Sequence, residues 1–352
     1  MNAAQIIDRL KSDTSFRHNM TAWKTMPARE ARYAGYPDRL HPKLVDGLKA
    51  RGITNLYTHQ RDAIDAVLDG GHVCVVTPTA SGKTLCYNVP VLNAIIGNPN
   101  ARALYLFPTK ALSQDQVAEL QTTVDTLKVK IGTYTFDGDT PASARKAIRS
   151  AGHIVVTNPD MLHTGILPHH TIWMKLFENL EFVVIDELHH YRGVFGSHLA
   201  NVVRRLKRIC EFYGSNPKFI CCSATINNPK EMAERIVEKP MRLVDNNGAP
   251  QGERHFLFYN PPVVNRELGI RASSVKEATR IASQMLTRNV QSIVFARSRL
   301  RVEILTTYLK EQVRRLGKSD KLVCGYRGGY LPTERRAIER GKLSVLPNAA
   351  GA

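Results

Sequence analysis

The stretch Val73-Cys-Val-Val-Thr-Pro-Thr-Ala-Ser-Gly-Lys-Thr84 predicts a strand, a tight loop and the start of a helix. Its first four residues form a short, mostly β-branched run, which is typical of a buried parallel strand. The N–H groups of such a loop, with the N-terminus of the following helix, point at anionic oxygens, so a triphosphate is the expected guest. Lys83 would act as a point charge at the β- and γ-phosphates, and the Thr84 hydroxyl would hold Mg²⁺. The pattern is that of a P-loop with one departure, because Thr77 stands where the first glycine is usual.

The composition of the chain favours a basic, two-domain protein. Its 352 residues are enough for two domains that each bury a core. It carries 49 Lys and Arg against 31 Asp and Glu, a net charge of +18 that is spread along the sequence. A basic surface of this size favours a polyanionic partner, most often nucleic acid. The alternative is a basic enzyme that has no such partner.

The cysteines and the apolar segments indicate the cellular compartment of the protein. The six cysteines show no Cys-x-x-Cys spacing and lie mostly in apolar runs, so we expect reduced core residues and neither disulfides nor a zinc site. The N-terminus lacks the apolar region of a signal peptide, and no stretch approaches a membrane span. We therefore expect a soluble cytoplasmic protein, associated with the nucleoid if the source is bacterial, with no membrane partner. The oligomeric state stays open.

Apolar strands alternate with amphipathic helices after the P-loop. We expect strands at Ala103–Phe107, Ile131–Thr135, His153–Thr157, Phe182–Ile185, Phe219–Cys222 and near Arg242–Val244. We expect helices at Ala111–Leu127, Pro141–Ser150, His198–Tyr213 and Pro229–Val237. This alternation predicts a parallel sheet covered by helices on both faces, with ligands at the carboxyl ends of the strands.

The chain is expected to divide into four segments. Residues 1–50 are a helical lead-in that packs on the first domain, and residues 51–245 form that domain. Residues 246–253 are a linker rich in turn-forming residues, and residues 254–352 form a partial second domain. In the second domain we expect strand-like segments at His255–Tyr259, Ser292–Phe295 and Lys321–Cys324, with helices at Ser274–Arg288, Leu300–Leu316 and near Thr333–Glu339.

Three further groups of residues suit a nucleotide. An apolar strand ends in Asp186-Glu187 at the same edge as the P-loop; Asp186 would hold Mg²⁺ through its water shell, and Glu187 would orient and deprotonate an attacking water. The hydroxyls of Ser223 and Thr225 would sense the γ-phosphate and bond to the Asp-Glu loop, or else form an ordinary turn. The amide of Gln60 would read adenine, if it is not a plain surface glutamine.

With these residues assembled, the chain resembles the helicases of superfamily 2, in particular the DEXH-box DNA-repair helicases of the mitomycin-repair-factor and RecQ4-like type. The matching elements are Tyr57–Gln60 as the adenine-reading motif, Thr77–Thr84 as motif I, Pro108–Gln114 as motif Ia, Thr157–Leu162 as motif Ib, Asp186–His189 as motif II, Ser223–Thr225 as motif III and Ser292–Arg299 as motif IV. The stretch Tyr191–His198, which follows motif II, is the part of the sequence that resembles this DNA-repair subgroup in particular.

The resemblance implies an α/β fold of two RecA-like P-loop domains, with parallel sheets flanked by helices and the second domain incomplete. It implies ATP and Mg²⁺ as cofactors, single-stranded or partly duplex DNA as partner, with RNA as the alternative, and 3′ to 5′ movement in repair. The implied nucleotide-binding residues are Gln60, Thr79, Ala80, Ser81, Gly82, Lys83 and Thr84. The implied metal ligands are Thr84 and Asp186, and the implied catalytic residues are Lys83, Asp186 and Glu187. Coupling would fall to Ser223, Thr225 and His189, and phosphate contacts to Thr109, Lys110, Thr157, Asn158 and Arg297.

The family pattern breaks after Arg340. The sequence ends at Ala352 without the arginine-rich motif VI, without motif V and without the cysteine-rich zinc domain usual in this subgroup. Loss of an arginine finger costs on the order of 10³–10⁵ in turnover. Three hypotheses therefore stay open: an ATP-dependent DNA helicase or translocase, a truncated module that binds ATP and single strands without hydrolysis, and an ATPase directed to RNA or protein.

Overall fold

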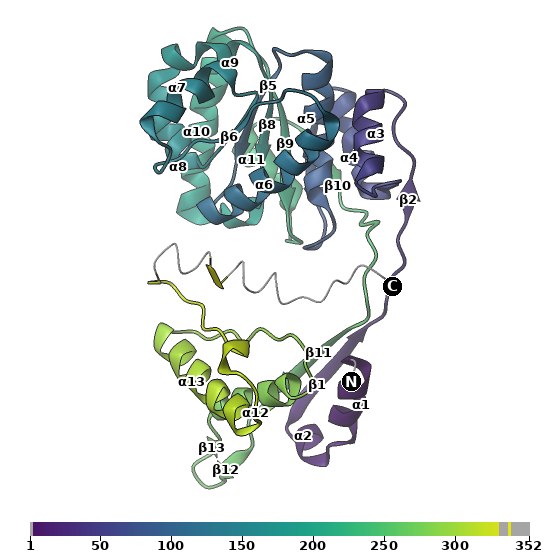
Figure 1. Cartoon of the computed structure of the whole chain (residues 1–352), viewed down its shortest axis with the longest axis vertical. Helices are drawn as coiled ribbons and strands as arrows, with labels where there is room; N and C mark the ends of the chain where they lie inside the picture. The colour runs from purple at the N-terminus through teal and green to yellow at the C-terminus, as the bar shows by residue number, and fades with distance from the viewer. Residues whose placement is uncertain (1–2, 331–336, 339–352) are drawn as a thin grey trace. The chain divides into compact units, whose positions relative to one another are not determined.

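The computed structural model describes residues 3–330 and 337–338 of the chain, and it divides into two compact units. One unit comprises Ala28–Gly252. The other combines Met1–Pro27 with Glu253–Ala352. Figure 1 shows the elements of both units.

A seven-stranded sheet forms the centre of the unit of residues 28–252. Its order is β10-β4-β9-β8-β5-β7-β6, and every adjacent pair is parallel. The strands are β4 (His72–Val76), β5 (Arg102–Leu106), β6 (Thr133–Thr135), β7 (Ile154–Thr157), β8 (Leu180–Ile185), β9 (Lys218–Ser223) and β10 (Met241–Val244). The register pairs Val76 with Ser223 and Leu106 with Ile185, so the carboxyl ends of the central strands meet at one edge. The predicted parallel sheet is confirmed for this unit.

Helices cover both faces of the sheet (Figure 1). They are α3 (Pro42–Ala50), α4 (Thr58–Leu68), α5 (Lys83–Gly97), α6 (Lys110–Leu127), α7 (Ala142–Ala151), α8 (Pro159–Met161), α9 (Met174–Glu178), α10 (Gly193–Phe212) and α11 (Pro229–Val237). Shorter elements are the π-turn η1 (Leu162–Ile166), the 3₁₀ turns η2 (Leu167–Trp173) and η3 (Leu188–His190), and a small antiparallel pair, β2 (Tyr33–Ala34) with β3 (Leu56–Tyr57).

Successive residues of each strand enter opposite cores. Val73 and Val75 of β4 pack with helices α3, α4, α5 and α6, whereas Cys74 and Val76 pack with α10 and α11. This follows from the two-residue period of a strand, which points neighbouring side chains to opposite faces. A strand between two cores must be apolar throughout, which explains the uninterrupted valine-rich run. All six cysteines are free thiols, and only Cys324 is exposed.

The other unit is built on an antiparallel ribbon. Its elements are α1 (Ala3–Ser12), α2 (Thr14–His18), β1 (Met20–Met26), β11 (Arg254–Tyr259), β12 (Val263–Asn265), β13 (Ile270–Arg271), α12 (Ser274–Leu286), α13 (Arg299–Arg315) and the 3₁₀ turn η4 (Asp320–Leu322). Strand β1 pairs with β11, with Trp23 opposite Leu257. Phe16 of α2 packs in a cluster with Leu257 and with Ile281 of α12.

This ribbon corrects the prediction for the N-terminal segment. Residues 3–27 group with the second unit: β1 pairs with β11, and residues of α1 and α2 share an apolar cluster with that ribbon. Residues 28–50 do belong to the P-loop unit. The boundary between the two units, at Gly252 and Glu253, falls within the predicted linker.

Two predicted strands of the second unit are also wrong. Ser292–Phe295 is unpaired backbone with Phe295 90% exposed, and the segment from Lys321 falls partly in the 3₁₀ turn η4. A strand forms only beside a neighbour that accepts its hydrogen bonds, and the strand pairs seen in the described part of this unit are the antiparallel β1–β11 and β12–β13. The described residues therefore place a RecA-like parallel sheet in the P-loop unit alone. Most of the helix predicted near Thr333–Glu339, and everything after it, lies outside the described residues.

No helix within residues 3–330 and 337–338 is both long and apolar enough to span a membrane.

Candidate nucleotide-binding site

The predicted phosphate loop joins the end of β4 to the start of α5. Gly82 precedes α5 in the left-handed region with φ 77°, and a Cβ there would meet Gln60 Nε2 at 2.6 Å. Glycine is therefore needed both for its backbone angle and for space. Thr77 Oγ1 and Ser81 Oγ lie 2.6 Å apart and hydrogen-bond across the loop, with both side chains buried. Thr77 is the residue that departs from the usual P-loop pattern. Its hydrogen bond to Ser81 connects the two ends of the loop.

We expect Gly82→Ala to destabilise the P-loop unit more than Gly70→Ala. Both glycines have positive φ, which costs a residue with a Cβ about 1–2 kcal/mol. At Gly70 a Cβ would meet nothing within 4 Å, so that variant reports the backbone term alone. At Gly82 the new methyl would also displace Gln60, for an additional loss of about 1 kcal/mol. Urea unfolding measures both free energies, and equal losses would contradict a role for the Gln60 contact.

Lys83 lies folded against its own loop. Its Nζ donates to the carbonyl of Thr77 at 2.9 Å and to that of Pro78 at 3.0 Å. The tip of the loop, Thr79 and Ala80, is exposed, and Ala80 has φ 63°, which is uncommon outside glycine. A phosphate at the loop would compete with the two carbonyls for the ammonium group.

A row of polar side chains within hydrogen-bond distance joins the P-loop helix to the strand end that carries Asp186. Thr84 Oγ1 donates to Gln116 Oε1 at 3.3 Å. Tyr87 OH lies 3.2 Å from the same Gln116 oxygen and 3.1 Å from Asp186 Oδ2. Tyr87 has a single hydroxyl hydrogen, so it cannot donate to both acceptors at once. Asp186 is 8% exposed, and burial is the largest cause that raises the pKa of its carboxyl to about 6.

Sequence reasoning missed Tyr87 and Gln116. Tyr87 stands four residues after Lys83, one helical turn along α5, so the spacing alone puts it on the face of the helix that carries Lys83. Gln116 lies in α6, the helix after β5, and no local pattern marks it. Thr84 and Asp186, the two predicted metal ligands, are thus connected through two residues rather than directly.

Glu187 follows Asp186 in a strained conformation. Its φ is 51°, and its N–H donates to Asp186 Oδ1 at 2.7 Å. Its carboxylate Oε2 lies 3.3 Å from His189 Nδ1, and the same nitrogen lies 3.4 Å from the N–H of Ala224. When unprotonated, Nδ1 accepts from Ala224, and when protonated it donates to Glu187. Burial is the main cause that lowers the pKa of His189.

The contact between the two loops therefore runs through the backbone of Ala224, and the predicted hydroxyls do not make it. Within the described residues the Ser223 hydroxyl is buried without a hydrogen-bond partner. Thr225 is exposed. His189 is the side chain that reaches across, because both loops leave neighbouring parallel strands, β8 and β9, at the same edge.

Gln60 is buried and tied to the P-loop. Its Oε1 accepts from the N–H of Tyr57 at 2.8 Å, and its Nε2 donates to the Gly82 carbonyl at 2.9 Å. This leaves at most one N–H and one lone pair of the amide for a base. Tyr33 stacks on Tyr57 with ring centroids 5.4 Å apart. Tyr36 instead donates its hydroxyl to the Ile53 carbonyl and packs against the core.

Comparison with known proteins places the chain in a family. Residues 57–232 match the DEAD/DEAH box helicase family. The chain belongs to this family. The match includes the P-loop, Asp186, Glu187, His189 and Ala224, whereas Tyr33, Tyr36 and Ile53 lie before it. It confirms the predicted resemblance to superfamily 2 helicases.

Individual DEAD/DEAH box relatives are similar over almost the whole chain. The uncharacterized ATP-dependent helicase YprA of Bacillus subtilis is 56% identical over 95% of this chain and 45% of its own length. The ATP-dependent helicase HRQ1 of Saccharomyces cerevisiae is 36% identical over 96% of this chain and 32% of its own. The crystal structure of the DUF1998 helicase MrfA bound to DNA and AMPPNP has a TM-score of 0.90 and 53% identity over 97% of this chain and 47% of its own. The chain thus spans less than half the length of these relatives.

The residues predicted for nucleic acid differ in what they offer a DNA phosphate. Thr109 and Lys110, after β5, are exposed, and Lys110 pairs with Asp139 at 2.8 Å. Thr109 Oγ1 accepts from a backbone N–H of α6, at 3.4 Å. Asn158 Oδ1 caps α8 by accepting from the N–H of Met161 at 2.8 Å, which leaves its NH₂ group for a phosphate oxygen.

The structure argues against one of these residues. Thr157 is 1% exposed, and its hydroxyl donates to the Phe136 carbonyl at 2.6 Å. That hydroxyl is used inside the fold and does not reach the surface, so the predicted phosphate contact is not supported. Arg297 lies in the other unit and is exposed.

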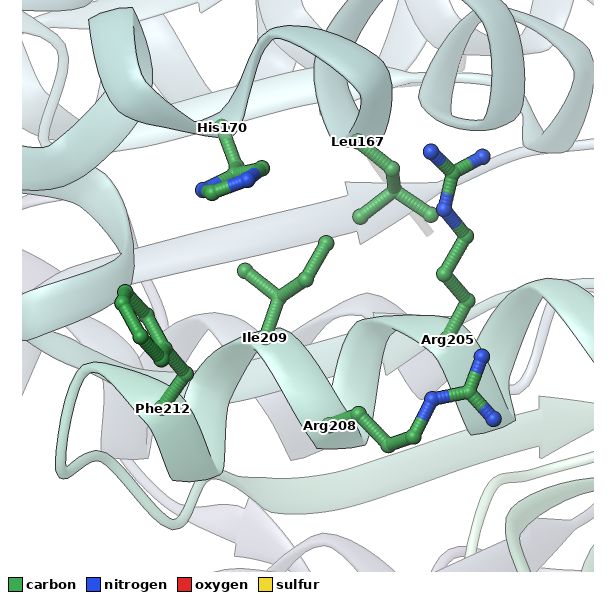
Figure 2. A pocket seen from close by; sticks show the side chains of 6 residues that line it. All are labelled: Leu167, His170, Arg205, Arg208, Ile209 and Phe212. Atoms are coloured by element: carbon green, nitrogen blue, oxygen red, sulfur yellow. The ribbon is translucent and has the colours of Figure 1, made fainter.

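Two hollows lie outside the P-loop. One, of about 820 Å³, lies between α10 and α11 and is lined by the segments from Tyr191 and from Ile226 that follow motifs II and III. The other, of about 370 Å³, is lined by Leu167, His170, Arg205, Arg208, Ile209 and Phe212. Figure 2 shows His170 and Leu167 facing the helix that carries Arg205 and Phe212. Arg205 stands twelve residues into α10, about 18 Å along its axis, so this second hollow is separate from the nucleotide site.

Proposed function

We propose that this chain is the ATP-binding part of an ATP-dependent DNA helicase or translocase that moves 3′ to 5′ and acts in repair. The observation that carries the proposal is the row of polar contacts from Thr84 through Gln116 and Tyr87 to Asp186. It connects the P-loop helix to the acidic strand end, which supports a shared site for the phosphates and their metal ion. The helicase names of YprA and HRQ1, and the MrfA complex with DNA and AMPPNP, support it.

The residues present fit a magnesium ion. No group of three or more His, Cys, Asp or Glu side chains within the described residues is arranged to hold a metal. Mg²⁺ is commonly held by one or two protein oxygens together with substrate phosphates, so such a cage is not required. Asp186 and Thr84 would hold the ion, which supplies charge neutralisation at the phosphate oxygens. A cation there would also offset the burial of the Asp186 carboxylate, whose pKa is raised to about 6.

The other residues would position the substrate and move one proton. Lys83 would exchange its two loop carbonyls for phosphate oxygens. Glu187 would orient the attacking water and accept its proton. The Nδ1 of His189 would either donate to this carboxylate or accept from the N–H of Ala224 in the neighbouring loop. The Gln60 amide would bind the base while it holds Gly82.

The basic charge of +18 favours a nucleic acid of either kind, and the preference for DNA rests on the MrfA complex. Lys110 and Asn158 in one unit, and Arg297 in the other, would contact phosphates without reading bases. Contacts of this kind weaken as salt is raised.

The test is nucleotide titration followed by phosphate release with and without single-stranded DNA or RNA. We expect Lys83→Ala to weaken MgATP binding about 100-fold, because a charged hydrogen-bond donor to phosphate is lost. Lys49→Ala, which removes the same charge at an exposed position of α3, should leave the affinity unchanged. Equal affinities of the two variants would refute the site.

The same assay separates the competing functions. DNA-stimulated turnover supports the helicase or translocase, and faster unwinding of duplexes with a 3′ overhang than with a 5′ overhang supports the polarity. Binding of nucleotide and DNA without turnover would favour a non-hydrolysing module. Stronger stimulation by RNA would favour an RNA-directed ATPase.

A further inference from the structure

The segment after β10, which the sequence marks as a linker, is buried at its centre. Asn247 is 8% and Ala249 3% exposed. Gly248 lies so close to the start of α4 that a Cβ would overlap the Thr58 hydroxyl and approach the Arg32 carbonyl to 2.9 Å. This segment runs to Gly252, the last residue of the P-loop unit. It is therefore bound to the first turn of α4 and is not a free tether.

Several hydrogen bonds hold the segment there. The side chain of Arg32 donates to the Asn247 carbonyl at 3.0 Å, and its backbone N–H donates to the Gly248 carbonyl at 2.8 Å. Asn246 Nδ2 donates to Asp62 Oδ2 at 2.7 Å. All of these bonds lie within the P-loop unit.

His59 connects this segment to the region of the P-loop. Its Nδ1 accepts from the N–H of Gly248 at 3.2 Å, so the neutral ring carries its hydrogen on Nε2. The His59 ring is fully buried, and burial is the main cause that lowers its pKa to about 4. The Ser81 backbone has a smaller, opposite effect and raises the pKa. Nε2 has no hydrogen-bond partner within bonding distance among the described residues. The next residue, Gln60, donates to the Gly82 carbonyl.

We propose that His59 is a positioning residue that couples nucleotide in the P-loop to the hold on Gly248. When the loop rearranges around phosphates, a loop carbonyl at Ser81 comes within reach of the buried Nε2–H. Because a neutral imidazole has one donor and one acceptor nitrogen, a satisfied Nε2–H fixes Nδ1 as the acceptor for Gly248. Nucleotide would then tighten the segment that leads toward the second unit. This inference rests on the proposed function, since it requires nucleotide at the loop.

The test is hydrogen exchange at the Gly248 amide, measured with and without a saturating, hydrolysis-resistant ATP analogue and Mg²⁺. In the unaltered chain we expect the analogue to slow exchange about tenfold. In His59→Asn the side-chain oxygen still accepts from Gly248 but the Nε2–H is gone. We expect this variant to protect Gly248 without nucleotide and to lose most of the response to it.

A second variant keeps the inference testable on its own. His59→Ala removes the acceptor as well, so the Gly248 amide should exchange about tenfold faster in both states. A full nucleotide response in His59→Asn, or no response in the unaltered chain once binding is measured, would overturn the coupling. A titration that detects no nucleotide binding by the unaltered chain would instead overturn the proposed function, and with it the coupling, before any exchange is compared.

Discussion

Glu187→Gln is expected to slow phosphate release by about 10²–10⁴, because the amide cannot take a proton from the attacking water. Affinity for MgATP should change by less than about threefold, since the proposed phosphate and metal contacts belong to Lys83, Thr84 and Asp186. The substitution preserves the size of the side chain, and a glutamine can still pair with His189 Nδ1, now 3.3 Å from the carboxylate. Steady-state phosphate release with single-stranded DNA, together with nucleotide titration, measures both quantities.

The control for this variant is Glu178→Gln. Glu178 is an exposed residue of α9 in the same unit, so it tests the loss of one negative charge without the chemistry. It should leave turnover within about twofold. If Glu178→Gln slows turnover as much as Glu187→Gln does, or if Glu187→Gln weakens nucleotide binding by the same factor as turnover, then Glu187 does not act as the base.

Asp186→Asn should stabilise the protein at neutral pH while it removes the magnesium dependence of nucleotide binding. The pKa of Asp186 is raised by burial to about 6 from its ordinary value of 3.8. The folded state therefore holds this proton more tightly than the unfolded state, and stability falls as pH rises from about 4 to about 6. Above that window the buried charge lowers the free energy of unfolding by about 3 kcal/mol. Asparagine is neutral and avoids the cost.

The hydrogen bonds favour the same outcome. In Asp186→Asn the side-chain oxygen of the asparagine could accept from the N–H of Glu187, as Oδ1 of the aspartate does now. Its NH₂ group could donate to Tyr87, whose hydroxyl hydrogen would then serve Gln116 alone. Thermal unfolding across pH 4–8 measures the effect: the variant and the unaltered protein should agree near pH 4 and diverge toward pH 7. A constant difference at every pH, or a less stable variant at pH 7, would contradict the assignment of the pH dependence to Asp186.

The P-loop unit could be predicted closely because its signals are local. The apolar run at Val73–Val76 is needed wherever a strand lies between two cores, and the glycine at position 82 is needed wherever the backbone takes a positive φ beside another side chain. Asp186-Glu187 was predicted to lie near the loop from one rule, that the carboxyl ends of parallel strands share an edge. These inferences depend on the two-residue period of a strand and on the chirality of the backbone. Both can be recognised from residues that are adjacent in the sequence.

The second unit could not be predicted in the same way. The segment Ser292–Phe295 has the composition of a strand, yet a strand exists only if another strand offers hydrogen bonds, and composition does not report that. The partner of β11 is β1, more than two hundred residues earlier in the chain, and no local pattern joins them. For this reason the sequence does not predict that residues 3–27 group with β11 while residues 28–50 belong to the P-loop unit.

The sequence by itself determined the P-loop, the parallel sheet around it and the helicase family, because spacing and residue type carry that chemistry directly. Only the tertiary structure decided that Thr77 closes the loop with Ser81, that Tyr87 and Gln116 connect Thr84 to Asp186, and that the supposed linker is held by His59. Each of these depends on side chains from separate elements meeting at hydrogen-bond distance. Such meetings are set by the packing of the whole unit, which no short stretch of sequence contains.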